Sequence, residues 1–160
     1  MATFDELPLR YRLALAIYPW RRIDPVPWTP LAGPLAAARV ALVSSAGLYR
    51  PGEDAPFAHV RGGDTSWRAI PDAVPSAALG FGQTSDAFDR APAEADRELV
   101  WPRAHLHALA ASGTIGAVAP RHLSFNGSIT APARLVRQSA PEMAEVLRAD
   151  MVDAALLVPV

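Results

Sequence analysis

Uninterrupted apolar runs alternate along this chain with segments whose apolar residues recur at helical spacing. The stretch RVALVSSAG, residues 39–47, contains such a run at Val40–Val43 and then opens into small residues. A run of this kind is typical of a central parallel strand that is covered on both faces. The final stretch MVDAALLVPV has the same character, and we predict a buried strand at 154–160. A further strand, followed by a loop, is predicted within residues 116–130.

Two segments have the period of an amphipathic helix. In the first, Pro102 suits the opening turn and Gly113 is a natural stop. Its predicted apolar stripe consists of Leu106, Leu109 and Ala110. The second helix is predicted to begin at Ser139, which has capping-box spacing to Glu142. The residues of this helix that we expect to face the core are Met143, Val146 and Leu147.

The remaining segments are predicted to be less regular. A short helix at Glu6–Ile17 leads into a segment that is too rich in proline for a long regular element. Its prolines and tryptophans are Pro19, Trp20, Pro25, Pro27, Trp28, Pro30 and Pro34. Residues 48–76 are predicted to be a loop because of their glycines and prolines, and a short strand is predicted at Ala77–Phe81.

Strands that alternate with helices predict an α/β fold. We expect a doubly wound, mainly parallel sheet, Rossmann- or flavodoxin-like, with a proline-rich N-terminal arm. The predicted division places the helix and arm in residues 1–38 and the α/β domain in residues 39–160.

The composition is that of an ordinary globular protein. Of 160 residues, 51% are hydrophobic and 19% are charged, and the net charge of −1 favours neither nucleic acid nor an anionic membrane as a partner. No apolar run approaches the roughly 18 residues of a membrane helix. The start MATFDELPLR lacks the features of a signal peptide, so we expect a cytoplasmic protein. The chain has no cysteine, which excludes a disulfide or a cysteine nucleophile within these residues.

Acidic residues and histidines are the first candidates for chemistry. His122, between a predicted strand and a glycine-containing loop, is the best candidate for an acid or base, although a lone histidine is more often structural. His105 and His107 are two residues apart, so on a helix they point in different directions and cannot chelate one metal. The acids of residues 86–98 either bind a cation or form a solvated loop before a helix. A weaker alternative is a metal hydrolase built from Asp86, Asp89, Asp96 and His122.

The segment RGGDTSWR, residues 61–68, is a candidate for binding an anion. Its glycines can form a nest of backbone N–H groups with Arg61 and Arg68 nearby, or simply a turn. Its spacing fits neither a P-loop nor a dinucleotide fingerprint, and the chain has no G-x-S-x-G elbow. No cofactor is therefore evident from motifs.

Five segments occur in an order and spacing that a known family shares. They are PLAAARVALVSSAGLY, APFAHVRGGDTSWRAIP, AFDRAPAEADRELVWP, ASGTIGAVAPRHLSFNGSI and VDAALLVPV. From about residue 34 onward the chain resembles the selenoprotein B family, the B subunits of the glycine, sarcosine, betaine and D-proline reductases together with shorter relatives.

The resemblance implies an oxidoreductase that reductively cleaves a C–N bond at the α-carbon of an amino-acid-like substrate. A selenocysteine or cysteine attacks that carbon, and a dithiol reductant regenerates the nucleophile while becoming a disulfide. The implied partners are a reductase subunit that carries a pyruvoyl group and, as a further expectation, a second copy of the chain.

The family places its redox residue immediately after the strand that matches ALLVPV, which is a position after Val160 and absent from this chain. Of the matching positions, we expect Asp89 and His122 to be catalytic. The predicted substrate-binding residues are Ser44, Ser45, Gly47, Gly63, Asp64 and Ser124. No metal ligand is expected.

Three explanations of the missing nucleophile stay open: a selenocysteine codon read as a stop, a truncated chain, or a natural short paralogue without a nucleophile. The alternative function, from a different class, is a non-catalytic binding or scaffold protein on the same fold.

Overall fold

The computed structural model describes residues 7–18, 22–86 and 88–160 and forms two compact units, Met1–Pro30 and Leu31–Val160. In the first unit, helix α1 spans Leu9–Ile17 and confirms the predicted N-terminal helix over those residues. The predicted positions Glu6, Pro19 and Trp20 lie outside the described residues.

Residues 22–34 contain neither helix nor strand. That they form an arm, and that a domain boundary follows residue 38, stay predictions. No helix within the described ranges is long and apolar enough to span a bilayer.

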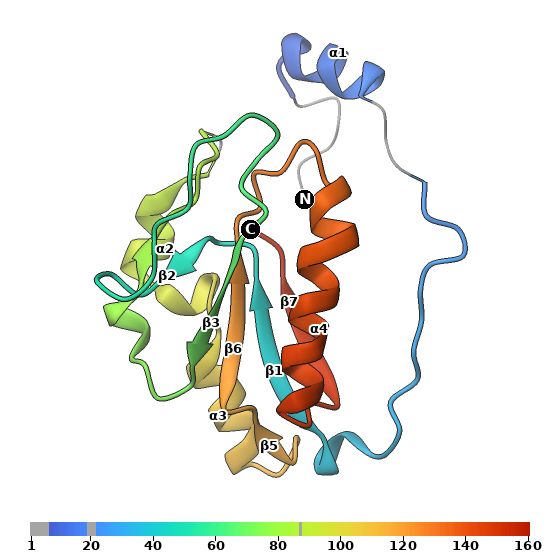
Figure 1. Cartoon of the computed structure of the whole chain (residues 1–160), viewed down its shortest axis with the longest axis vertical. Helices are drawn as coiled ribbons and strands as arrows, with labels where there is room; N and C mark the ends of the chain where they lie inside the picture. Colours follow the sequence, from blue (N-terminus) through green and yellow to red (C-terminus); the bar gives the residue numbers. More distant parts are fainter. Residues whose placement is uncertain (1–6, 19–21, 87) are drawn as a thin grey trace. The chain divides into compact units, whose positions relative to one another are not determined.

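The second unit is built on a five-stranded, mostly parallel sheet (Figure 1). Strand β1, Arg39–Ser44, lies at its centre, as its apolar run predicted. β1 is parallel to three strands, which are β5 (Ala117–Val118), β6 (Arg121–Phe125) and β7 (Ala154–Val158). Val43 and Ser44 pair with both β6 and β7, so these two strands flank β1 on opposite sides.

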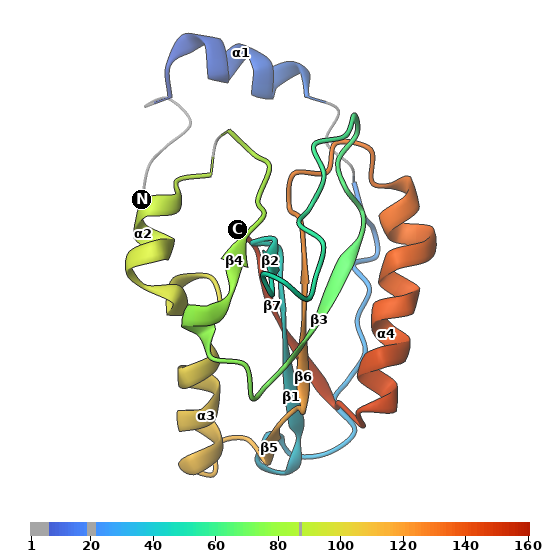
Figure 2. The same cartoon turned by 60° about the vertical axis from the view of Figure 1, so that its left-hand side comes forward.

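Helices cover both faces of this sheet, and Figure 2 shows α4 on one face and α2 with α3 on the other. Their bounds are Arg90–Ala95 for α2, Arg103–Ala111 for α3 and Ala140–Ala149 for α4. Because side chains alternate along a strand, Leu42 of β1 belongs to the larger core and Val43 to the smaller one. The larger core also contains Ile70, Trp101 and Leu106, and the smaller one Leu123 and Met143.

The segment predicted as a loop at 48–76 contains two strands. β3, Trp67–Pro71, runs antiparallel to β6, so the sheet is mixed. β2, Leu48–Tyr49, pairs with β4, Gly80–Phe81, in a small separate sheet. The predicted strand at 77–81 therefore survives only at its end, because a 3-10 helix occupies Ser76–Ala78. The Rossmann- or flavodoxin-like assignment stays a prediction.

Both predicted amphipathic helices form, with two corrections. Leu109, placed on the apolar stripe of α3, is 41% exposed. Ser139 does not cap α4, because a π-helical turn at Leu135–Ser139 already precedes that helix. The Ser139 hydroxyl donates instead to the Thr65 carbonyl at 2.6 Å. Met143, Val146 and Leu147 face the smaller core as predicted.

β7 forms as predicted, but it is not buried. Leu156 is 44% exposed and Leu157 is 68% exposed, although these consecutive side chains point to opposite faces of the sheet. Within the described residues, β7 pairs only with β1. An apolar run predicts burial on both faces, but the helices pack over β1 and β6 and leave the flanking strand open.

Candidate functional site

The carboxyl ends of β1, β6 and β7 meet at one edge of the sheet, where open α/β folds place their ligands. Ser45, directly after β1, connects the three ends. Its hydroxyl accepts the Val160 N–H at 2.8 Å and donates to the Val160 carbonyl at 3.3 Å. Its own carbonyl accepts the Gly127 N–H at 2.8 Å. The backbone at the tip of β7 is therefore fixed by the side chain that directly follows β1.

Two glycines allow this close packing. A Cβ atom on Gly127 would lie 2.9 Å from the Val160 carbonyl oxygen and 3.1 Å from that of Ser45. Gly47 has a φ of +68°, and a Cβ there would lie 2.9 Å from the Gln83 backbone nitrogen. Only glycine fits both positions without displacing backbone.

Buried amides complete the edge. Gln83, which is 7% exposed, donates from Nε2 to the Ser45 carbonyl at 3.1 Å. Asn126, which is fully buried, donates to the Thr84 hydroxyl at 2.7 Å and accepts the Ser128 N–H at 3.0 Å. The Asn126–Thr84 bond joins the loop after β6 to the loop after β4, and the Gln83–Ser45 bond joins the loop after β4 to the end of β1.

A cavity of about 290 Å³ lies against this edge. The residues that line it are Gln83, Ser85, Phe88, Asp89, Gly127, Ser128 and Val160. Asp89 is exposed there and caps α2, since its Oδ1 accepts the Ala91 N–H at 3.1 Å. The predicted catalytic Asp89 and the tip of β7 thus share one cavity, which we call the β7-tip cavity.

Two of the predicted substrate-binding residues line a different, larger cavity of about 600 Å³. Gly63 packs against the backbone of Ser128 and Ile129, and both Asp64 oxygens accept backbone N–H groups at 2.8 Å, from Ala58 and Ser66. Burial alone would raise the pKa of Asp64, but these hydrogen bonds and the charge of Arg68 hold it below its usual range.

Ser44 and Ser124 are fully buried and line neither cavity. The Ser44 hydroxyl donates to the Val100 carbonyl at 2.8 Å, and the Ser124 hydroxyl accepts the Leu48 N–H at 2.7 Å. Both bonds hold chain segments in place, and the predicted roles of these serines in binding substrate stay predictions.

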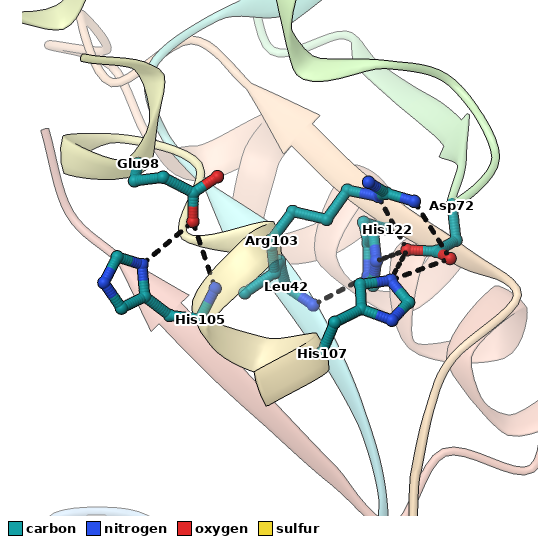
Figure 3. Close-up of polar contacts among 7 residues, drawn as sticks. All are labelled: Leu42, Asp72, Glu98, Arg103, His105, His107 and His122. Carbon is teal, nitrogen blue, oxygen red and sulfur yellow. Dashed lines mark hydrogen bonds and ion pairs between the residues drawn. The ribbon is translucent and has the colours of Figure 1, made fainter. Parts of the chain in front are cut away.

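His122 is also fully buried, and it lies at the start of β6, away from the β7-tip cavity beyond that strand's end. Its Nδ1 accepts the Leu42 N–H at 3.0 Å, and its Nε2 lies 3.0 Å from Asp72 Oδ1 (Figure 3). A backbone N–H can only donate, so the proton of the ring sits on Nε2. Burial lowers the pKa of His122, against the raising effect of Asp72.

The Asp72 carboxylate accepts hydrogen bonds from three side chains, as Figure 3 shows. Besides His122, its Oδ1 accepts from Arg103 Nε at 2.9 Å and from His107 Nε2 at 3.0 Å. Burial would raise the pKa of Asp72, but the bonds from His107, Arg103 and His122 lower it. The network joins the end of β3 to α3 and β6, so it stabilises the sheet at the edge opposite the β7-tip cavity.

His105 turns away from this network and lies 2.9 Å from Glu98 (Figure 3), which confirms that His105 and His107 point in different directions. Of the four residues of the metal-hydrolase alternative, Asp89 and Asp96 cap separate helical turns and His122 bonds to Asp72. Within the described ranges, no group of three or more His, Cys, Asp or Glu side chains is placed to hold a metal ion.

Comparison with known proteins assigns the chain to a family. A family model described as glycine/sarcosine/betaine reductase selenoprotein B matches residues 14–160. The chain belongs to this family. It is similar to the D-proline reductase subunit gamma of Acetoanaerobium sticklandii, with 32% identity over 138 residues. The match covers 84% of this chain and 54% of that relative, so the chain spans about half of the relative's length. No solved structure matches.

Within this selenoprotein B family chain, reasoning from the sequence missed Asp72, Gln83 and Asn126. Asp72 follows a strand that was predicted to be a loop, and its PDAVP context indicates only a turn. Gln83 and Asn126 each follow a short strand and carry polar amides, a signal that points to a strand end but does not reveal which strand ends meet.

Proposed function

We propose that this selenoprotein B family chain is a subunit or homologue of a glycine, sarcosine, betaine or D-proline reductase, and that the β7-tip cavity binds its amino-acid-like substrate. The observation that carries the proposal is the double hydrogen bond between the Ser45 hydroxyl and the Val160 backbone, at the wall of the cavity that contains Asp89.

Ser45 is a positioning residue in this proposal. Because its hydroxyl fixes both the N–H and the carbonyl of Val160, it also fixes the direction in which the next peptide unit leaves the strand. The family places its selenocysteine or cysteine directly after this strand. Val160 lines the β7-tip cavity together with Gly127 and Ser128, which supports a nucleophile next to this cavity.

The reaction that the family implies is a displacement followed by a reduction. The selenolate or thiolate forms a bond to the α-carbon while the C–N bond breaks, and the amine leaves with that electron pair and takes up a proton. A dithiol then supplies two electrons that break the new Se–C or S–C bond, the α-carbon takes up a proton, the selenol or thiol is regenerated, and the dithiol becomes a disulfide. In this proposal the Asp89 carboxylate, which is exposed and lines the cavity, holds the substrate's amine.

The proposal gives His122 no role at the β7-tip cavity, because both of its ring nitrogens form hydrogen bonds within the protein interior. Its predicted catalytic role stays a prediction. The pyruvoyl group is assigned to the partner subunit and has no assigned contact in this chain. A cytoplasmic location and assembly with a reductase partner and a dithiol reductant belong to the same proposal.

Isothermal titration with glycine, sarcosine, betaine and D-proline tests the substrate site. We expect at least one of them to bind, and Asp89→Asn to weaken that binding about tenfold, which is about 1.4 kcal/mol. Asp86→Asn is the matched control, because Asp86 is exposed in the same loop and does not line the cavity.

Equal affinities for the parent and Asp89→Asn would contradict the assignment of Asp89. Binding of none of the four would favour the scaffold alternative. The codons after Val160 separate the two functions independently: an in-frame UGA or cysteine codon with continued reading supports the reductase, and a UAA stop supports the scaffold.

A further inference from the structure

The larger cavity shares no lining residue with the β7-tip cavity. We propose that it binds a small organic oxyanion, a carboxylate or phosphate group on an apolar or aromatic body, through the guanidinium groups of Arg61 and Arg134. The cavity encloses about 600 Å³ between the loop before β3 and the turn that leads into α4. That volume suits a ligand of drug or cofactor size.

The carboxylates in the cavity wall are already engaged. Asp64 accepts two backbone N–H groups and is held in its charged form, with Arg68 as its countercharge. Glu142 accepts the indole N–H of Trp67 at 3.2 Å. Neither acid forms an ion pair with the two arginines that line the same cavity, among the residues that the structure describes.

The arginines retain donors for a ligand. Arg134 uses its Nε to donate to Gln138 at 3.1 Å, and its two terminal nitrogens have no partner among the described residues. Arg61 makes no hydrogen bond or ion pair within the same described ranges. Both side chains are exposed at the cavity. A guanidinium presents a fork of N–H groups that matches a carboxylate or a phosphate.

Arg68, the second arginine of the sequence-predicted nest, is occupied elsewhere. Its Nε and a terminal nitrogen donate to the Ala55 carbonyl at 3.0 and 2.7 Å, and the guanidinium lies 4.3 Å from the centre of the Phe57 ring. Arg68 does not line the cavity, whereas Arg134, 73 residues after Arg61 in the chain, does. The anion site predicted from RGGDTSWR is therefore completed by a residue outside that segment.

Apolar surface lies beside the charges. Val60, Trp67 and Ala131 line the same cavity, and Trp67 also packs against the smaller core, which holds its ring in place. An aromatic or aliphatic body can rest on this wall while the oxyanion meets the guanidinium groups. Gly63, packed on the backbone of Ser128 and Ile129, lies where the wall of this cavity meets the loop that borders the β7-tip cavity.

Isothermal titration with benzoate, phenyl phosphate and neutral benzamide tests the proposal. We expect benzoate, phenyl phosphate or both to bind, more weakly at high salt, and benzamide to bind at least tenfold more weakly. Arg61→Gln and Arg134→Gln should each weaken binding at least fivefold. Arg137→Gln is the matched control, since Arg137 is exposed in the π-helical turn that directly follows Arg134 but does not line the cavity.

Binding of only one of the two anions supports the proposal and identifies the oxyanion. The proposal is overturned if neither anion binds, if benzamide binds equally, if both cavity variants bind like the parent, or if Arg137→Gln loses as much affinity. Circular dichroism of each variant confirms that it is folded. A negative result would not bear on substrate binding at the β7-tip cavity, because Arg61, Arg134 and Arg137 do not line that cavity.

Discussion

The hydrogen bonds of His122 determine its protonation. A proton on Nδ1 would face the Leu42 N–H at 3.0 Å and break that bond, and the ring has no exposed surface at which water could compensate. His122, which the sequence suggested as an acid or base, therefore has hydrogen bonds that favour one neutral tautomer. Asp89, which the family resemblance suggested as catalytic, is exposed beside the tip of β7.

This leads to a prediction about pH. The folded-state pKa of His122 is lowered, so on acidification the unfolded state, with a pKa near 6.5, takes up a proton before the folded state does. The stability that His122 contributes is present above about pH 6.5 and is lost as the pH falls below it, at up to about 1.4 kcal/mol per pH unit. Histidine NMR should show the neutral Nε2–H tautomer of His122 still present at pH 6.

His105 provides the internal comparison, because its side chain is 75% exposed. Urea denaturation across pH 5.5–7.5 should show less pH dependence in His122→Gln than in the parent, whereas His105→Gln should retain most of it. A His122 resonance that titrates above pH 6.5 in the parent protein would refute the neutral assignment, whether or not the variant folds.

At the scale of elements, the strands with strong apolar runs could be predicted and the pairing could not. The run at Val40–Val43 indicated the central strand, and the helical periods of α3 and α4 were sufficient to locate both helices. β3 escaped prediction because a five-residue strand that ends in proline lacks a clear alternation. The start of α4 at Ala140 agrees with the prediction, but the capping role of Ser139 does not, because a capping box cannot be distinguished locally from a serine that bonds across the fold.

The exposed position of β7 leads to a second prediction. Leu157→Ala should lower the free energy of unfolding by less than about 1 kcal/mol, because the Leu157 side chain is 68% exposed. Leu123→Ala, the matched control in the fully buried part of β6, should cost about 2–5 kcal/mol. Urea denaturation of the isolated chain measures both, and equal losses would show that β7 is buried in solution.

For the whole molecule, the sequence was enough to predict an α/β protein and, through the resemblance, its family. It was not enough to predict which loops meet. Ser45 and Gly63 were assigned to one substrate site, but Ser45 bonds to Val160 in the wall of the β7-tip cavity, whereas Gly63 lines the larger cavity. Contacts such as Ser45 with Val160 join residues 115 positions apart, and no local pattern encodes them.

The central claim is that substrate binds at the tip of β7, and amide NMR on the chain as it stands tests it most directly. On titration with glycine, sarcosine, betaine and D-proline, at least one ligand should shift the backbone resonances of Gly127, Ser128 and Val160 saturably, while those of the Asp72 network stay unchanged. Saturable shifts confined to other parts of the molecule, or none with any of the four, would contradict the claim.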